Sequence, residues 1–249
     1  MKIGILQTGH PPTELAPTHG DYPSMFERLL GGRGFTFQTW SVVDGEFPAG
    51  PQDADGWLIT GSRHGVYEDH PWIAPLEALV RDIIAAGKPL VGIRTASHAF
   101  ALRNAEQPEG HDTWPGFDAE VWGGNYTGHH PAGPKTKVDV VQNAAGHPIL
   151  TGLDLSQFTG SGSLYQNHPL KSSARPLLNG SIPDKPTEPI AWTSQHKGGG
   201  RAFYTSLGHK GDFQSEVFQQ LLRNAIYWAA GLDVPAGADS TAETTGSCE

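Results

Sequence analysis

Pro89-Leu90-Val91-Gly92-Ile93-Arg94-Thr95-Ala96-Ser97-His98-Ala99-Phe100 is the stretch that decides the fold this sequence predicts. It begins as a short apolar strand, breaks into a polar turn and continues with a helical pattern. In a parallel α/β sheet the ligand crevice lies beyond the carboxyl ends of the strands, so the residues from Arg94 to His98 are expected at the functional edge. A nucleophile elbow needs cysteine or serine at the first turn position, and this chain has Arg94 there, followed by Thr95.

Apolar periodicity on both sides of this stretch predicts alternating strands and helices. Before it, strand patterns cover 2–7, 35–43 and 56–60, and helical patterns cover 21–33, with Asp21 as N-cap, and 72–86. After it, strands are predicted at 119–122, 135–141, 175–180, 188–193 and 201–206, with a hairpin turn at Gly198-Gly199-Gly200 and a helix at 214–230. The alternation predicts an α/β fold, a flavodoxin-like, doubly wound and mostly parallel sheet.

The composition bounds the domain organisation and the classes of partner. Residues 1–231 are expected to form a single domain, and 232–249 have too little apolar surface to order themselves, which predicts a disordered tail. The net charge is −9 and the 17 basic residues form no cluster, so nucleic acid and anionic membranes are not expected partners. No apolar run approaches a membrane span or a signal peptide, which favours a cytoplasmic protein. The oligomeric state stays open, a homo-oligomer included.

Histidine and cysteine usage bounds the chemistry. The single cysteine, Cys248, excludes an internal disulfide and a cysteine-rich metal site. Histidine is the usual group for proton transfer near neutral pH and a common zinc ligand. Seven histidines fall in predicted loops: His10, His64, His98, His129, His130, His168 and His209. The alternative for each is a helix cap or a bond to a loop carbonyl. Adjacent residues of an extended chain point opposite ways, so no metal site is predicted at His129-His130, although zinc or a similar ion stays an alternative.

Several other residues are candidates for binding a substrate. Arg94 can hold an anionic or hydroxyl-rich substrate, and the alternative is an ion pair with Glu120 or Asp212. Gly61 allows positive φ and backbone N–H groups that face a ligand. The aromatic residues Trp122, Tyr126, Tyr165 and Trp192 lie beside glycine and asparagine, which suits a sugar ring, with Asn125 as the best polar partner; the alternative is a place in the core.

Motifs along the chain resemble two families. The first ninety residues resemble class I glutamine amidotransferases of the GMP-synthase-like kind, through Lys2-Ile3-Gly4-Ile5-Leu6-Gln7, His19-Gly20-Asp21-Tyr22, Trp57-Leu58-Ile59-Thr60-Gly61-Ser62 and Tyr67-Glu68-Asp69-His70-Pro71-Trp72-Ile73. From about Gly92 onward the chain resembles trehalose-utilisation (ThuA-like) proteins, through Gly92-Ile93-Arg94-Thr95-Ala96-Ser97-His98-Ala99-Phe100, Gly123-Gly124-Asn125-Tyr126-Thr127-Gly128-His129-His130 and Tyr204-Thr205-Ser206-Leu207-Gly208-His209. The two families share an amidotransferase-like, flavodoxin-related fold, so the chain looks composite.

The resemblance implies what the site can and cannot do. Amidotransferases of this class place a cysteine where Arg94 stands and a His-x-Glu-like element after the last strand. Here the nucleophile is absent, and Asp212 follows His209 at a spacing of three instead of two. A guanidinium stays protonated and cannot replace a thiolate, so cysteine-dependent glutaminase activity is not expected.

The ThuA resemblance implies a protein that binds or transforms a small carbohydrate or an oxidised sugar. In that interpretation His209 is the general base or acid, oriented by Asp212, with His98 or His129 as its partner and Arg94 on substrate oxygens. Asn125, Trp122, Tyr126 and Gly61 complete the predicted site, and no cofactor is expected. One alternative is a catalytically inactive amidotransferase-like binding or regulatory protein. A hydrolase that uses Thr95 or Ser97 is disfavoured, because neither occupies the elbow position.

Overall fold

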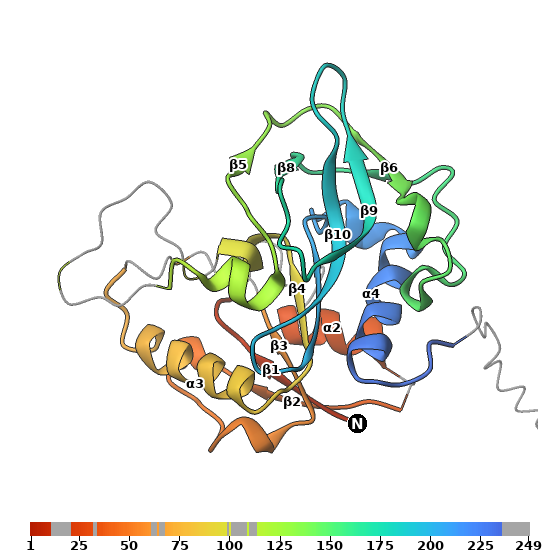
Figure 1. Cartoon of the computed structure of the whole chain (residues 1–249). Helices are drawn as coiled ribbons and strands as arrows, with labels where there is room; N and C mark the ends of the chain where they lie inside the picture. The colour runs from red at the N-terminus through yellow and green to blue at the C-terminus, as the bar shows by residue number, and fades with distance from the viewer. Residues whose placement is uncertain are drawn as a thin grey trace, which may run out of the picture.

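A mixed sheet forms the centre of the part of the chain that the structure describes (Figure 1). The structure is a computed structural model that describes residues 1–10, 21–31, 34–60, 64, 68–98, 100, 109 and 114–235. Within these ranges the sheet has nine strands in the order β2-β1-β3-β4-β11-β10-β9-β6-β7. The first five are parallel to one another, in the 2-1-3-4-5 arrangement of flavodoxin-like folds, and the other four continue the sheet in antiparallel pairs. The predicted fold class is confirmed.

The strands lie close to their predicted positions. Their bounds are β1 Lys2–Leu6, β2 Thr36–Trp40, β3 Gly56–Ile59, β4 Leu90–Ile93, β6 Thr136–Val140, β7 Thr159–Gly160, β9 Arg175–Ser181, β10 Glu188–Gln195 and β11 Arg201–Thr205. A separate small sheet pairs β5, Gly128–His129, with β8, Tyr165–Gln166. The predicted turn at 198–200 joins the antiparallel strands β10 and β11, where the amide of His196 donates to the carbonyl of Gly200 at 3.1 Å.

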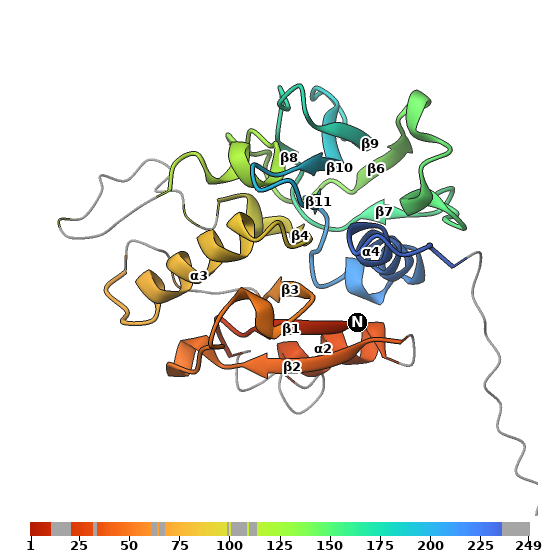
Figure 2. The ribbon, with the colours of Figure 1, turned by 60° about the horizontal axis from the view of Figure 1, so that its bottom comes forward.

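The helices cover both faces of the sheet, as a doubly wound fold requires. Their bounds are α2 Tyr22–Leu30, α3 Ile73–Ala85 and α4 Glu216–Ala229, with 3₁₀ turns at Val42–Asp44, Pro51–Asp53, Arg94–His98, Gln142–Ala144, Pro148–Leu150 and Asp212–Gln214. Asp21 caps α2 as predicted, since its carboxylate accepts from the amide of Ser24 at 2.9 Å. Figure 2 shows α3 on one side of the sheet and α4 on the other. None of the helices that the structure describes is long and apolar enough to cross a membrane.

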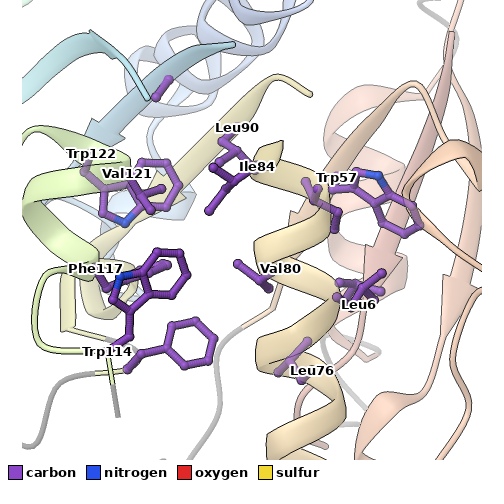
Figure 3. Close-up of a cluster of buried hydrophobic side chains, with 14 of the residues drawn as sticks. Leu6, Trp57, Leu76, Val80, Ile84, Leu90, Trp114, Phe117, Val121 and Trp122 are labelled. Atoms are coloured by element: carbon purple, nitrogen blue, oxygen red, sulfur yellow. The ribbon is translucent and has the colours of Figure 1, made fainter. Parts of the chain in front are cut away.

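The sheet buries alternate side chains on its two faces. On β11, Tyr204 packs in the cluster that includes α3, and Phe203 packs in the cluster that includes α4. On the α3 face, the apolar side of the helix lies between two sets of side chains (Figure 3). Residues of β1 and β3 are on one side of the helix, and the aromatic residues Trp114, Phe117 and Trp122 are on the other. The labelled side chains are Leu6, Trp57, Leu76, Val80, Ile84, Leu90, Trp114, Phe117, Val121 and Trp122. Successive side chains of a strand point to opposite faces of the sheet. Because helices cover both faces here, both sets of side chains are buried, which explains why the central strands are apolar along nearly their whole length.

One predicted strand is wrong. Residues 119–122 were expected to be extended, but Asp118–Trp122 is a π-helical turn. Val121 and Trp122 are both buried, which a strand cannot achieve on a single face because successive side chains point in opposite directions. Packing of Trp122 against Gly92 and Tyr204 therefore outweighs the local strand pattern. Gly123, at φ 70°, ends the turn in the left-handed conformation that glycine adopts without strain.

The predicted tail is mostly outside the described residues. Residues 236–249 have no described structure, so the expectation of a disordered segment at 232–249 stays a prediction. The same holds for the single-domain boundary at 231, although every described helix and strand ends by Ala229.

Close packing at Gly92 gives a testable prediction for the fold. A methyl group at position 92 would lie 2.8 Å from two ring atoms of Trp122. The ring has little room to move, because it is 4% exposed and its Nε1 donates to the carbonyl of Ala96 at 2.9 Å. We expect Gly92→Ala to lower the free energy of unfolding by about 1–3 kcal/mol through overpacking. Urea denaturation measures the loss.

Gly146→Ala is the matched control, since a methyl group there meets nothing within 4 Å. It should leave stability unchanged or raise it slightly. A Gly92→Ala variant as stable as this control would contradict the packing described for Trp122.

Candidate functional site

The turn after β4 has the backbone of a nucleophile elbow. Arg94 has φ 50°, a conformation that non-glycine residues rarely adopt. Its carbonyl accepts from the Tyr204 hydroxyl at 2.6 Å and from the Ser97 hydroxyl at 3.3 Å. Burial is the main cause that raises the pKa of Tyr204 well above its usual range, so the hydroxyl stays protonated and donates this hydrogen bond. The chain therefore keeps the strained strand-to-helix turn but places a guanidinium where the elbow carries a nucleophile.

The Arg94 side chain bonds to neutral groups. One guanidinium nitrogen donates to the carbonyl of Ser206 at 3.2 Å, and another donates to the hydroxyl of Ser163 at 3.3 Å. Within the described ranges Arg94 has no ion pair, because Glu120 pairs with Lys197 at 2.7 Å and Asp212 bonds to backbone amides. The alternative of an ion pair with either carboxylate is therefore wrong. Arg94 is thus a half-buried cation with no ion-pair partner among the residues that the structure describes.

Three of the predicted binding residues meet at the ring of Tyr165. The Arg94 guanidinium lies 4.9 Å from the ring centroid, Tyr126 packs at 4.7 Å between centroids, and His129 stacks at 6.1 Å with 27° between the planes. The β5–β8 pairing sets His129 directly opposite Tyr165. We call Arg94, Tyr126, His129 and Tyr165 the Tyr165 cluster. Tyr165 is buried, Arg94 and Tyr126 are half-buried and His129 is exposed, so the cluster extends from the interior to the surface.

His129 and His130 lie in different environments. The Nδ1 of His129 lies 3.0 Å from the carbonyl oxygen of His130. His129 is exposed whereas His130 is 8% exposed, as expected for neighbours on an extended chain. The Nε2 of His130 has no hydrogen-bond partner in the described part of the molecule.

Asp212 has a different role from the predicted one. It is 1% exposed, and its carboxylate accepts from the amides of Ser161 at 2.7 Å, Gly208 at 2.8 Å and His209 at 2.9 Å. The expected pairing with the His209 ring is thus replaced by contacts to the backbone. Buried N–H groups need acceptors, and a carboxylate that accepts three of them fixes the loop that carries His209.

His209 itself stays accessible on this loop. Its Nδ1 accepts from the amide of Gly211 at 3.3 Å, and its Nε2 has no partner among the residues described. The neutral ring therefore carries its proton on Nε2. The loop lies beside the elbow, because a methyl group at Gly208 would be 3.8 Å from the Cβ of Arg94.

The other predicted residues have structural contacts or lie outside the description. Trp122 belongs to the core and is 4% exposed, and Trp192 is 1% exposed with its Nε1 donating to the carbonyl of Trp122 at 2.7 Å. Asn125 donates to the carbonyl of His168 at 2.9 Å. Gly61 and the side chain of His98 are outside the described residues, so their predicted roles are untested.

Asp118 is a residue that the sequence reasoning missed. Its Oδ2 accepts from the amide of Tyr126 at 2.6 Å, and its Oδ1 is buried without a partner in the described structure. Burial raises the pKa of Asp118 to about 6, against the opposing effect of the Tyr126 amide. A π-helical turn and a shifted carboxyl pKa are both frequent at functional sites. The signal in the sequence is Gly124, where any side chain would collide with the Asp118 carboxylate.

Comparison with known proteins identifies the family of this chain. The trehalose-utilisation (ThuA) family matches residues 67–229, more than half of the chain. This chain belongs to the ThuA family. The match begins upstream of Gly92 and so includes part of the segment that resembles amidotransferases.

The relatives of this ThuA-family chain are distant. Gamma-glutamyl peptidase 4 of Arabidopsis thaliana is 35% identical over 96 residues, which are 37% of this chain and 38% of the plant protein, so the chain matches well under two thirds of that relative. A ThuA-like protein from Bacteroides uniformis has a TM-score of 0.61 at 20% identity, over 93% of this chain and 92% of that one. A glutamine amidotransferase from Thermotoga maritima has a TM-score of 0.53 at 14% identity, over 92% and 98%. These structures establish the shared fold.

The raised pKa of Asp118 predicts a pH-dependent stability. The folded protein binds the proton more tightly than the unfolded chain, whose pKa is near 3.8, so stability decreases as pH rises from about 4 through about 6. Asp118→Asn keeps an acceptor for Tyr126 and removes the buried charge. Its stability relative to the wild type should therefore improve by about 2–3 kcal/mol between pH 4 and pH 8. Urea unfolding at both pH values measures the change, and an unchanged difference would mean that Asp118 titrates normally.

Proposed function

We propose that this ThuA-family protein binds a small carbohydrate or an oxidised sugar at the Tyr165 cluster, with Arg94 as the anchoring group. The observation that carries the proposal is the half-buried Arg94 guanidinium, which has no ion-pair partner among the described residues. Its fork of N–H donors matches a carboxylate or a pair of hydroxyl oxygens. An acidic sugar supplies both groups.

The aromatic members of the cluster support the same class of ligand. Tyr126 and His129 both pack against the buried Tyr165 ring, which fixes their orientation. Flat rings beside hydrogen-bonding groups suit the apolar faces and hydroxyl rim of a sugar.

A proton-transfer step at this site is assigned to His209. Its loop is fixed by Asp212 and lies beside the elbow, and its Nε2 makes no hydrogen bond within the described structure. An imidazole can both donate and accept a proton, which suits transfer to or from a sugar hydroxyl.

The alternative is a catalytically inactive amidotransferase-like protein with a binding or regulatory role. The elbow conformation at Arg94 favours it, because the strained turn persists without a nucleophile. Ser97 does not supply one, since it is 1% exposed and its hydroxyl donates to the Arg94 carbonyl.

Ligand binding tests the role of Arg94. A panel of aldonic and uronic acids with the corresponding neutral sugars, titrated by calorimetry, should give binding to at least one acid. Arg94→Ala should weaken that binding at least about tenfold, because a hydrogen bond to a charged group contributes about 1.5–3 kcal/mol. Arg94→Lys should recover only part of the loss, since an ammonium lacks the planar fork.

Arg201→Ala is the matched control for this series. Arg201 also donates to a carbonyl, that of Trp228 at 2.7 Å, and also lies over an aromatic ring. It begins β11, so it lies at the amino-terminal end of that strand, and the elbow follows the carboxyl end of the neighbouring parallel strand β4. Equal losses in the two variants, or no binding by any sugar in the panel, would overturn the proposal.

Glutamine turnover should be absent. The wild type is expected to release no ammonia from glutamine above background, because a guanidinium cannot attack an amide carbon. Arg94→Cys alone should not restore activity, since Asp212 bonds to the backbone of the His209 loop and does not orient the ring. A coupled ammonia assay measures both proteins, and robust release by the wild type would contradict the assignment.

A further inference from the structure

We propose that His64, Glu68 and His70 form a binding site for a divalent transition-metal ion of the zinc class. These residues lie between β3 and α3 and are separate from the Tyr165 cluster in the sequence. One potential ligand atom from each lies within 4.8 Å of the others. Of all the groups of histidine, cysteine and acidic residues within the described ranges, this is the one in which three potential ligands meet in this way.

The ligand atoms converge on one carboxylate oxygen. The Nδ1 of His64 and the Nε2 of His70 each lie 3.0 Å from Oε2 of Glu68. The two imidazole rings are 4.2 Å apart between centroids. Neighbouring ligands of a tetrahedral zinc ion are about 3.3 Å apart, given bonds of about 2.0–2.1 Å. The carboxylate oxygen therefore has to move only a few tenths of an ångström from each nitrogen, whereas the two ring nitrogens, which lie within 4.8 Å of one another, have to approach one another by up to about 1.5 Å to bind one ion.

The surrounding structure holds both rings in place. Trp72 is 8% exposed and lies beside them, with His70 stacked on its ring at 6.0 Å and 17° and His64 against it at 6.1 Å and 72°. The turn before α3 fixes His70, whose amide donates to the carbonyl of Glu68 and whose carbonyl accepts from the amide of Ile73. Fixed rings lose less conformational entropy on binding an ion than mobile ones.

The donor set indicates the kind of ion and the state of the site. Two imidazoles with one carboxylate are typical ligands for zinc and unlike the all-oxygen sets of calcium or magnesium. Three protein ligands leave the fourth tetrahedral position for water or a ligand oxygen. The side chains are 22%, 36% and 32% exposed, so an ion and an exchangeable fourth ligand can reach them from solvent.

The competing account is a purely structural cluster. Two imidazole N–H groups that donate to one carboxylate would produce the same distances without an ion. The two accounts differ in whether the group takes up zinc in a defined ratio, and this difference is measurable.

The test uses the full chain without a histidine tag, stripped with chelator and then titrated with zinc chloride by calorimetry. We expect one zinc per chain and a higher melting temperature with zinc, because an ion that binds only the folded state stabilises it. His70→Ala and Glu68→Gln should each weaken zinc binding by more than about tenfold, the loss that even an outer partner of a zinc ligand can cause. Cobalt, added in place of zinc, should give visible absorption in the wild type that both variants lose.

His10→Ala is the matched control. His10 lies at the same 3.0 Å from a carboxylate, that of Asp44, but this pair belongs to no three-ligand group in the described part of the chain. It should bind zinc like the wild type. Circular dichroism checks that each variant folds, and Glu68→Gln keeps the size of the side chain if His70→Ala does not fold. No zinc in the wild type, or zinc binding unchanged in His70→Ala and Glu68→Gln, would overturn the proposal.

Discussion

The hydrogen bond from the buried Tyr204 hydroxyl to the Arg94 carbonyl supports the turn on which the candidate site depends. Tyr204 lies on β11 and Arg94 follows β4, so the bond joins the ends of two neighbouring parallel strands. The Trp122 ring lies beside Tyr204, at 6.1 Å between centroids, and stabilises the same turn because it donates to the carbonyl of Ala96. A left-handed backbone at a non-glycine residue costs about 1–3 kcal/mol and persists only where surrounding contacts determine it. Here the contacts come from two other segments of the chain, β11 and the π-helical turn at Asp118–Trp122.

The sequence predicts the parallel half of the sheet well because its signals are local. The signals are a continuously apolar strand, a helix with an apolar stripe and a glycine between them. Each of these elements can be recognised from about a dozen residues, as in α3 and β4. The π-helical turn at Asp118–Trp122 was not predictable in this way, since its conformation is decided by packing of Trp122 on Gly92. The roles of Asp212 and Asp118 also depend on distant partners. Asp212 binds an amide 51 residues away, and no spacing rule connects it to Ser161.

The candidate site combines features of the two families that the sequence resembles. The elbow of an amidotransferase-like fold is retained, whereas its reactive position holds an arginine that bonds to a carbonyl and a hydroxyl. The ThuA-like segment supplies Tyr126 and His129, whose rings both pack against Tyr165. His129 and Tyr165 face each other across the small β5–β8 sheet. A shared fold therefore carries a different set of groups at the same edge, which is why function here has to be argued from the site and not from the fold.

The mixed sheet also has a consequence for the order in which the chain folds. Strands β9, β10 and β11 are joined by short connections and pair antiparallel, so their contacts require little loss of chain entropy. The parallel pairing of β4 with β11 brings together segments 112 residues apart, as the contact between Arg94 and Ser206 illustrates. Long-range pairing of this kind forms slowly compared with local pairing. We therefore expect the antiparallel strands to pair early in folding, and the strained turn at Arg94 to form only when β4 joins β11.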